Sequence, residues 1–514
     1  MAWTRIQNTQ FAAATAASLN QTFATPTLVG SLLIAFVNSP GGSPTGVSDD
    51  KGNTWKPLGT PLVANISQIY YLSSSTAGTS VVTATSNSAG NAMKLSIAEY
   101  TGQLVSHPAD AHGGIAIVGQ PVGGVVSQQA GDLIVQEWTT NGTVKTWSAV
   151  TGITPETPLT SVSTFWGDNL SSVAGNNATS ANMGASPDCI GQTGAFLPST
   201  FTVPPGINVV RASETVSFLT GVQSSITSLI AGGNQAGNAI LAVVVGYNFS
   251  VDLVTGITDT VGNTYSLLSF QHGTNTLNAA ISVYIANPCA GFDGNNTITA
   301  AVTNHTYSAL EMFCVEISGQ HASPLDTVSL TNAATATKAY SITAAAANEL
   351  IVTIGTAISG ALWTPTGQTD ISTINNVNSG FAPSGSALEV AASKSVAGAN
   401  AMSITFGSAS YSIVALTLKA ATPVYSITGS LGASGAGATV AWTGASSGST
   451  TADGSGNYNT GIVLIAGSYT ITPTKPGFTF TPTSSPQTVS TNNITGVNFT
   501  AAANASGFAY SFDC

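Results

Sequence analysis

Charged side chains are scarce in this chain: only 6% of its 514 residues are Asp, Glu, Lys or Arg. Ordinary globular domains carry about 25%. A disordered polyampholyte and a long-helix protein are both excluded, because each depends on abundant charge. The 21 acidic and 10 basic residues give a net charge of −11, with too few cations to neutralise a phosphate backbone or an anionic lipid surface. We therefore expect no nucleic-acid partner.

Long apolar segments are also missing. No stretch reaches the roughly 18 apolar residues that a membrane helix needs, so we expect no membrane insertion. The first residues, MAWTRIQNTQFAAATAASLNQTF, place polar residues where a signal peptide has its apolar core, and we expect no classical export signal. The composition is nevertheless typical of extracellular or virion β-structure. Lytic release of a virus, a removed leader or non-classical secretion would each reconcile the two observations.

Cysteine and histidine are rare, with four and five residues. Neither a CxxC nor a Cys/His cluster occurs, so we predict no metal and no cofactor. The histidines show no HExxH spacing and lie near no GxSxG sequence. Cys289 and Cys314 are close enough in sequence for a disulfide between neighbouring strands, and two buried free thiols are the favoured alternative.

Glycine, by contrast, is abundant at 54 residues, and apolar residues make up 43% of the chain. The apolar residues fall in short or alternating runs separated by Gly, Asn, Ser and Pro, which is the pattern of β-strands and turns. No amphipathic stretch has helical length, so βαβ units are not expected. The sequence predicts an all-β protein made of antiparallel sandwiches.

An internal repeat organises most of the chain. SDDKGNTW (48–55) recurs as TDTVGNTY (258–265), and flanking segments recur in the same order: GSLLIAFV (30–37) with GNAILAVVV (237–245), IAEYTG (97–102) with CVEISG (314–319), and GDLIVQ (131–136) with NELIVT (348–353). Such ordered matches indicate a duplicated domain. Copies of about 200 residues exceed an immunoglobulin domain, so we predict two tandem jelly-roll-like β-sandwich domains over 1–221 and 222–421.

The repeated phrase itself predicts a tight turn between two strands. Asp49 and Asp259 are placed to accept hydrogen bonds from the backbone that follows them, and Gly52 and Gly262 to adopt positive φ. Asp49, Asp50 and Asn53 also carry the oxygen ligands that calcium prefers, although their spacing matches no calcium loop. The turn is the favoured interpretation.

A different module follows over 423–503. Its phrases ADGSGNY (452–458), GSYTITP (467–473) and GVNFT (496–500) resemble the small prealbumin-like, immunoglobulin-like sandwiches known as carboxypeptidase-regulatory-like or collagen-adhesin B-type domains. The resemblance implies a role in spacing or attachment and no catalytic residues. The two large copies resemble, more loosely, tandem β-domains of phage virion proteins and bacterial surface proteins.

Candidate site residues are few. Glu99 and Glu316 occupy equivalent places in the two copies, as do Asp110 and Asp326, and such recurrence favours a structural role over catalysis. Recurrence likewise favours core packing for Trp55 with Tyr265. The following two tryptophans lack a counterpart and are the candidates for contacts with glycans: Trp138 and Trp166.

The last residues, 504–514, form a short tail. Phe508, Tyr510 and Phe512 alternate with small residues, so an extended tail places the three rings on one face. We predict that this face docks on a neighbouring subunit, where Cys514 is available for a covalent contact. Packing on its own module or disorder is the alternative.

Together these features predict a non-enzymatic structural or interaction protein that works in multiple copies, with other virion or surface-layer subunits as partners. The expected setting is a phage virion, as a capsid decoration, head fibre or tail fibre protein. One alternative is a bacterial adhesin or surface-layer protein at the cell surface. Another is a lectin-like accessory that binds host glycans.

Overall fold

The structure is a computed structural model of the whole chain. It describes residues 3–504 except 41, 63–66, 74, 76–77, 89–91, 104–108, 118–121, 128–130, 141–147, 157–163, 173–174, 183–188, 200–205, 213–216, 231–232, 248, 274–278, 293, 334–336, 358–363, 367–368, 371–386, 406–410, 423, 462–463 and 491. Within these residues the regular structure consists of β-strands and one short 3₁₀ helix, η1 (Ala433–Gly435). The all-β prediction is confirmed. Across the described part of the chain, no helix has the length and apolar character to cross a membrane.

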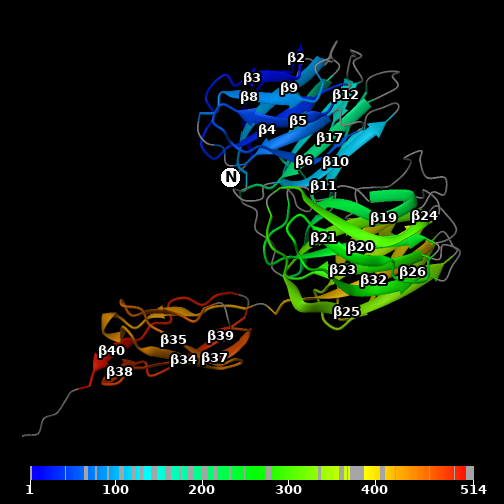
Figure 1. The fold of residues 1–514 in the computed structure, drawn as a ribbon. Helices are drawn as coiled ribbons and strands as arrows, with labels where there is room; N and C mark the ends of the chain where they lie inside the picture. The colour runs from blue at the N-terminus through cyan, green and yellow to red at the C-terminus, as the bar shows by residue number, and fades with distance from the viewer. Residues whose placement is uncertain are drawn as a thin grey trace, which may run out of the picture. The chain divides into compact units, whose positions relative to one another are not determined.

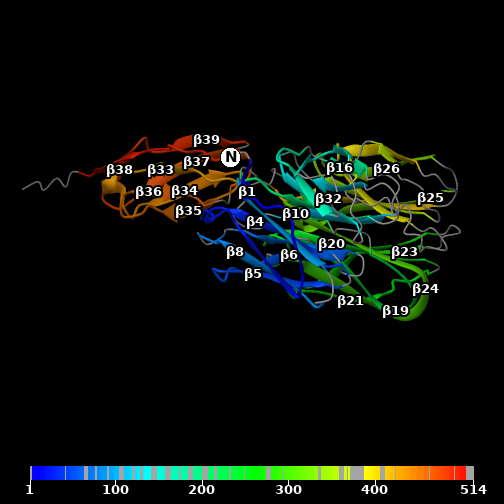
Figure 2. The same ribbon diagram turned by 90° about the horizontal axis from the view of Figure 1, so that it is seen from above.

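The chain divides into two compact units, Met1–Ala420 and Ala421–Cys514. The first unit contains the duplicated region, and the second contains the module that resembles prealbumin-like domains. The predicted boundary between residues 421 and 423 therefore lies at the junction that the structure shows. Figure 1 labels many of the strands of both units, and Figure 2 gives a second view of them.

The first sandwich of the larger unit uses nine strands. Its main sheet has the order β1-β9-β4-β7-β6 with β2 also paired to β9, and its smaller sheet has the order β3-β8-β5. The bounds are β1 (Thr4–Asn8), β2 (Ala12–Thr15), β3 (Ser18–Thr22), β4 (Leu32–Asn38), β5 (Pro44–Asp49), β6 (Lys56–Leu62), β7 (Ser67–Leu72), β8 (Val81–Ser86) and β9 (Ala92–Thr101).

The second sandwich repeats this arrangement. Its main sheet has the order β10-β17-β12-β15-β14, and its smaller sheet has the order β11-β16-β13. The bounds are β10 (Ala109–Ile117), β11 (Val122–Ser127), β12 (Leu133–Thr140), β13 (Ser148–Thr151), β14 (Thr154–Pro155), β15 (Thr164–Asn169), β16 (Gly175–Asn182) and β17 (Cys189–Phe196).

In the third sandwich, the long strand β24 serves both sheets. The main order is β18-β24-β20-β23-β22, and β19 and β21 also pair with β24. The bounds are β18 (Asn208–Ala212), β19 (Ser217–Ile230), β20 (Ala239–Tyr247), β21 (Val254–Asp259), β22 (Ser266–His272), β23 (Ala279–Ala286) and β24 (Asn296–Ser318).

The fourth sandwich again separates the two sheets, with orders β25-β32-β27-β30-β29 and β26-β31-β28. The bounds are β25 (Gln320–Ala333), β26 (Thr337–Ala344), β27 (Leu350–Ala357), β28 (Thr364–Thr366), β29 (Thr369–Asp370), β30 (Ala387–Lys394), β31 (Gly398–Thr405) and β32 (Tyr411–Ala420).

One topology underlies all four sandwiches. Numbered within each sandwich, and leaving out the extra strand β2, the main sheet runs first-last-third-sixth-fifth and the smaller sheet second-seventh-fourth. In the third sandwich, β24 covers the seventh and last positions. This nested antiparallel order is that of a jelly roll. The jelly-roll-like topology was predicted, but the number of sandwiches was not: each predicted domain of about 200 residues contains two of them.

A left-handed residue before the third strand marks each sandwich. Gly30, Gly131, Gly237 and Asn348 have φ of 77°, 92°, 87° and 64°. The backbone N–H of each donates to a carbonyl in the segment that follows the sixth strand, with N–O distances of 2.9, 2.9, 3.0 and 2.8 Å. Glycine suits this backbone because it has no Cβ, and asparagine is among the residues that tolerate it. The shared geometry supports a fourfold repeat.

This marker gives a stability prediction. Gly131→Ala should lower the free energy of unfolding by about 1–2 kcal/mol, because an L side chain is strained at positive φ. No atom lies within 4 Å of the added Cβ, so the cost is conformational. Asn348→Gly is the matched control and should change stability by less than about 0.5 kcal/mol, since Asn already tolerates the left-handed region. Urea denaturation measures both, and an unaffected Gly131→Ala would contradict the assignment.

The two sandwiches of each copy share a core. Apolar residues from β4, β7 and β9 pack directly against residues of β12, β15 and β17 in the first copy. In the second copy, residues from β20, β23 and β24 pack against β27, β30 and β32. Each main sheet of the first and third sandwiches is also covered on its other face by strands of its own smaller sheet. Strands buried on both faces read as continuous apolar runs, which explains LLIAFV and AILAVVV.

The predicted boundary between residues 221 and 222 is wrong. It falls inside β19, whereas the second copy begins with β18. The two copies also touch: Gly59 and Asn295 exchange two hydrogen bonds of 3.1 and 3.3 Å, and Leu229 packs against the core of the first copy. The copies therefore belong to one compact unit.

The smaller unit has its own core, built around Trp442, Tyr458, Tyr469 and Phe499. Its sheets have the orders β33-β36, β35-β34-β37-β39 and β38-β40. The bounds are β33 (Thr428–Ser430), β34 (Thr439–Gly444), β35 (Gly448–Thr451), β36 (Asn457–Asn459), β37 (Gly467–Thr474), β38 (Phe478–Thr481), β39 (Ser485–Val489) and β40 (Thr500–Ala503).

Candidate functional site

The repeated phrase forms the predicted turn in both copies. Asp49 Oδ1 accepts hydrogen bonds from the backbone N–H groups of Lys51 and Asn53 at 2.9 and 3.1 Å, and Asp259 Oδ1 accepts from three such groups. Gly52 and Gly262 have φ of 70° and 84°. The phrase recurs because the turn that it builds recurs.

The aromatic residue that closes the phrase is held by the same aspartate. Trp55 Nε1 donates to Asp49 Oδ2 at 2.9 Å, and Tyr265 Oη donates to Asp259 Oδ2 at 3.0 Å. Trp55 is buried in a core and Tyr265 packs against another, which confirms the predicted packing role.

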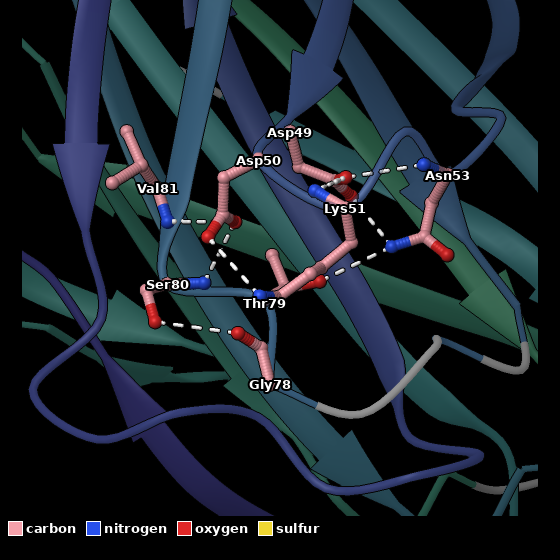
Figure 3. Close-up of polar contacts among 8 residues, drawn as sticks. All are labelled: Asp49, Asp50, Lys51, Asn53, Gly78, Thr79, Ser80 and Val81. Atoms are coloured by element: carbon pink, nitrogen blue, oxygen red, sulfur yellow. Dashed lines mark hydrogen bonds and ion pairs between the residues drawn. The ribbon is translucent and has the colours of Figure 1, made fainter.

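The calcium alternative has little support from this geometry. The Asp50 carboxylate accepts hydrogen bonds from the backbone N–H groups of Ser80 and Val81 at 2.9 and 3.2 Å, so it ties the turn to β8 (Figure 3). Burial acts to raise the pKa of Asp50, but these bonds and the nearby Lys51 together outweigh it and lower the pKa. Both carboxylate oxygens of Asp49 already accept hydrogen bonds from residues of the turn. Among the described residues, no three His, Cys, Asp or Glu side chains cluster as a metal site would require.

The recurring glutamates, Glu99 and Glu316, have a structural role that we call a clamp: each lies on the last strand and accepts hydrogen bonds from the loop before the third strand. Glu99 Oε1 accepts hydrogen bonds from Leu28 N and Ser31 Oγ at 2.7 and 2.8 Å. Glu316 Oε1 accepts from Gln235 N and Asn238 Nδ2, at the equivalent positions, at 2.7 and 2.6 Å. Both glutamates are fully buried. Each fastens the loop before the third strand to the last strand. Asp326 accepts from Ala345 N at 2.9 Å, whereas the side chain of Asp110 lies outside the described residues.

The proposed glycan contacts are wrong. Trp138 and Trp166 are 0% and 1% exposed, so neither ring presents a face to a sugar. Trp166 stacks on Phe36 with ring centroids 4.7 Å apart and donates from Nε1 to Ser96 Oγ at 2.8 Å. Trp138 packs at 5.2 Å on Phe165. The absence of a counterpart reflects different core packing in the two copies.

The possible disulfide between Cys289 and Cys314 is also wrong. Both are free and buried in the same core, which is the favoured alternative. Burial raises the pKa of the Cys289 thiol to about 11, and it raises the pKa of Cys314 further. Among the tail residues, Phe508, Tyr510, Phe512 and Cys514 lie outside the described part of the chain, so tail docking remains a prediction.

A reactivity prediction follows for the two thiols. In a Cys189→Ser, Cys514→Ser variant, native protein should react with a maleimide at least about 100-fold more slowly than unfolded protein, because buried thiols with raised pKa are poor nucleophiles. Mass spectrometry of the labelled protein gives the count. Rapid labelling of either cysteine in the native state would contradict the burial.

A buried group of polar residues lies between the facing main sheets of the first two sandwiches. Lys94, Asn38 and Ser67 stand in a row across β9, β4 and β7, since Asn38 pairs in register with both of the others. Glu137 of β12 and Thr164 of β15 reach them from the facing sheet. Ser67 Oγ donates to Glu137 Oε2 at 2.6 Å, and Lys94 Nζ donates to Thr164 Oγ1 at 2.8 Å. We call these five residues the Lys94 cluster.

Burial governs the electrostatics of the Lys94 cluster. Lys94 is 9% exposed, and Asn38 and Glu137 are 0% and 1% exposed. Loss of solvent raises the pKa of Glu137 to about 7, against smaller opposing effects of Ser67, Lys94 and Asn38. It also lowers the pKa of Lys94, against the attraction of Glu137. Both shifts favour the neutral amine and the neutral acid.

The side-chain amide of Asn38 lies beside Glu137 but is poorly satisfied. Both its Nδ2 and its Oδ1 are buried, and neither is in hydrogen-bond geometry with a partner. A buried amide without partners is costly, and such groups in native structures call for an explanation.

The second copy shows that the fold does not require the Lys94 cluster. Val245 pairs with Glu311 where Asn38 pairs with Lys94, and Ile354 takes the place of Glu137. There Glu311 accepts a hydrogen bond from Tyr247 Oη at 2.8 Å. Sequence reasoning missed the cluster because its residues come from five separate strands. The signal was present in the aligned repeats, where Asn, Lys and Glu replace Val, Glu and Ile.

Comparisons with known proteins add little. No protein-family model matches the chain, and no curated protein matches it. Among solved structures, a biofilm-associated protein BSP domain aligns over 79% of this chain and 98% of its own length, with 8% identity and a TM-score of 0.13. That score is too low to carry any argument about this protein.

Proposed function

We propose that this chain is a non-enzymatic structural protein of a phage virion, a capsid decoration, head fibre or tail fibre protein that works in many copies. The observation that carries the proposal is the repetition of one sandwich four times, with the recurring acidic residues used as turns and clamps. Repeated sandwiches joined through shared cores suit a structural protein that presents surfaces to neighbouring subunits.

The distribution of charge supports assembly. Of the 31 charged residues, at least nine are buried: Lys94, Glu99, Asp132, Glu137, Asp168, Arg211, Glu311, Glu316 and Glu349. These side chains are therefore not available at the surface, which already has few charges. Charged side chains are a main device by which β-proteins avoid association through sheet edges. A surface with so few of them suits a protein covered by neighbouring copies.

Localisation tests the proposal. Antibodies against the purified chain, used for immunogold electron microscopy on cultures of the source, should label released particles. Label confined to the cell wall would instead identify a surface-layer or adhesin protein. Soluble label on neither structure would contradict both. The lectin-like alternative loses its support, because its two candidate contact residues are buried.

A further inference from the structure

We propose that Lys94 and Asn38 become joined by an intramolecular isopeptide bond, formed spontaneously in the folded first sandwich with Glu137 as the proton carrier. The proposal concerns a covalent modification and does not depend on the proposed function. It would lock together β4 and β9, two adjacent strands at the centre of the main sheet.

Three groups needed for this reaction meet in the Lys94 cluster. Lys94 supplies a primary amine and Asn38 a carboxamide directly opposite it on the neighbouring strand, where Cβ atoms lie about 4.5–5.5 Å apart. Glu137 supplies a carboxyl group from the facing sheet, positioned by Ser67. Side chains alternate along a strand, so Asn38 and Lys94 share the face that packs on β12.

The reaction balances without another reagent. Lys94 Nζ, as the neutral amine, attacks Asn38 Cγ, and the Nζ–Cγ bond forms. Glu137 donates its proton to Nδ2 and takes one from Nζ. The Cγ–Nδ2 bond then breaks with its electron pair leaving on ammonia. One amine and one primary amide become one secondary amide and one ammonia, with no oxidation or reduction.

Two features of the site favour formation of the bond over a cluster whose side chains stay unreacted. Burial shifts both titrating groups toward the protonation states that the reaction uses, the neutral amine and the neutral acid. The buried Asn38 amide lies beside Glu137 and neither of its polar atoms has a hydrogen bond of good geometry, so it is poorly stabilised as an unreacted group. In the second copy the apolar residues Val245 and Ile354 occupy the positions of Asn38 and Glu137. Core packing therefore does not require polar residues at these positions.

The peptide map of the full chain tests the bond. Trypsin does not cut after an acylated lysine or at Lys56–Pro57, so the cross-linked protein should yield a branched peptide joining 6–51 to 52–145, lighter than its parts by one ammonia. Separate peptides 6–51, 52–94 and 95–145 would overturn the proposal. Loss of ammonia at Asn38 with cleavage after Lys94 would overturn it too, because that pattern reports deamidation chemistry.

Variants test the roles. Lys94→Met should abolish the branched peptide, and Glu137→Gln, which keeps the shape of the side chain, should slow its formation at least about 100-fold, the scale of general acid–base catalysis. Lys51→Arg, at an exposed lysine of the same sandwich, keeps the trypsin site after residue 51; it is the matched control and should retain the branched peptide. Wild-type rate in Glu137→Gln would overturn the proton-carrier role. The wild-type map decides the bond itself even if a variant fails to fold.

Discussion

Replacing Arg211 by methionine is expected to lower the free energy of unfolding by about 3–5 kcal/mol, the cost of leaving one member of a buried ion pair without the other. Arg211 Nη1 lies 2.9 Å from Glu316 Oε2, and both side chains are 0% exposed. The remaining partners of Glu316, Gln235 N and Asn238 Nδ2, both contact its other oxygen. Chemical denaturation followed by fluorescence measures the loss.

The first copy supplies the control for this prediction. At the equivalent position Gln7 Nε2 donates to Glu99 Oε2 at 2.6 Å, so a neutral amide can serve the clamp. Arg211→Gln should therefore cost less than Arg211→Met. The double variant Arg211→Met, Glu316→Gln should also recover part of the loss, because it removes the isolated charge. Equal stability of Arg211→Met and wild type would show that the pair is unimportant.

Trp166→Ala is expected to cost about 3–5 kcal/mol, the range for removing a large aromatic side chain from a core. The side chain stacks on Phe36 and donates to Ser96 Oγ, and the Arg5 guanidinium carbon lies 5.6 Å from its ring centroid. It therefore stabilises the contact between the first two sandwiches. Trp166→Phe keeps a ring on Phe36 and should lose less than half as much. A glycan-contact residue on the surface would give almost no loss in either variant.

Much of the scaffold was predictable from local sequence. The Asp-x-x-Gly-Asn phrase fixes its turn through bonds within a few residues, so Asp49 and Asp259 behave as their pattern indicates. The strands were also predictable from short stretches of sequence, because each is a short apolar or alternating run of residues. The fourfold repeat was harder to see, because Gly30 and Gly131 precede third strands whose remaining residues differ. Their shared signal is a backbone conformation and a hydrogen bond, which single-sequence matching does not register.

The candidate site depends on contacts that sequence alone does not reveal. Trp138 and Trp166 were candidates for glycan contacts because they lack a counterpart in the second copy, and the sequence does not reveal their ring partners Phe165 and Phe36. Asn38, Lys94 and Glu137 are separated by 43 residues or more, and each is unremarkable by itself. They become a reactive group only when two sheets of different sandwiches pack face to face.

Sedimentation of the purified full chain tests the central claim, that this is a structural protein working in many copies. The sparsely charged surface predicts a defined oligomer or larger assembly whose population rises with protein concentration and which persists at high salt. A chain that remains a soluble monomer at high concentration, with no larger species, would contradict the account.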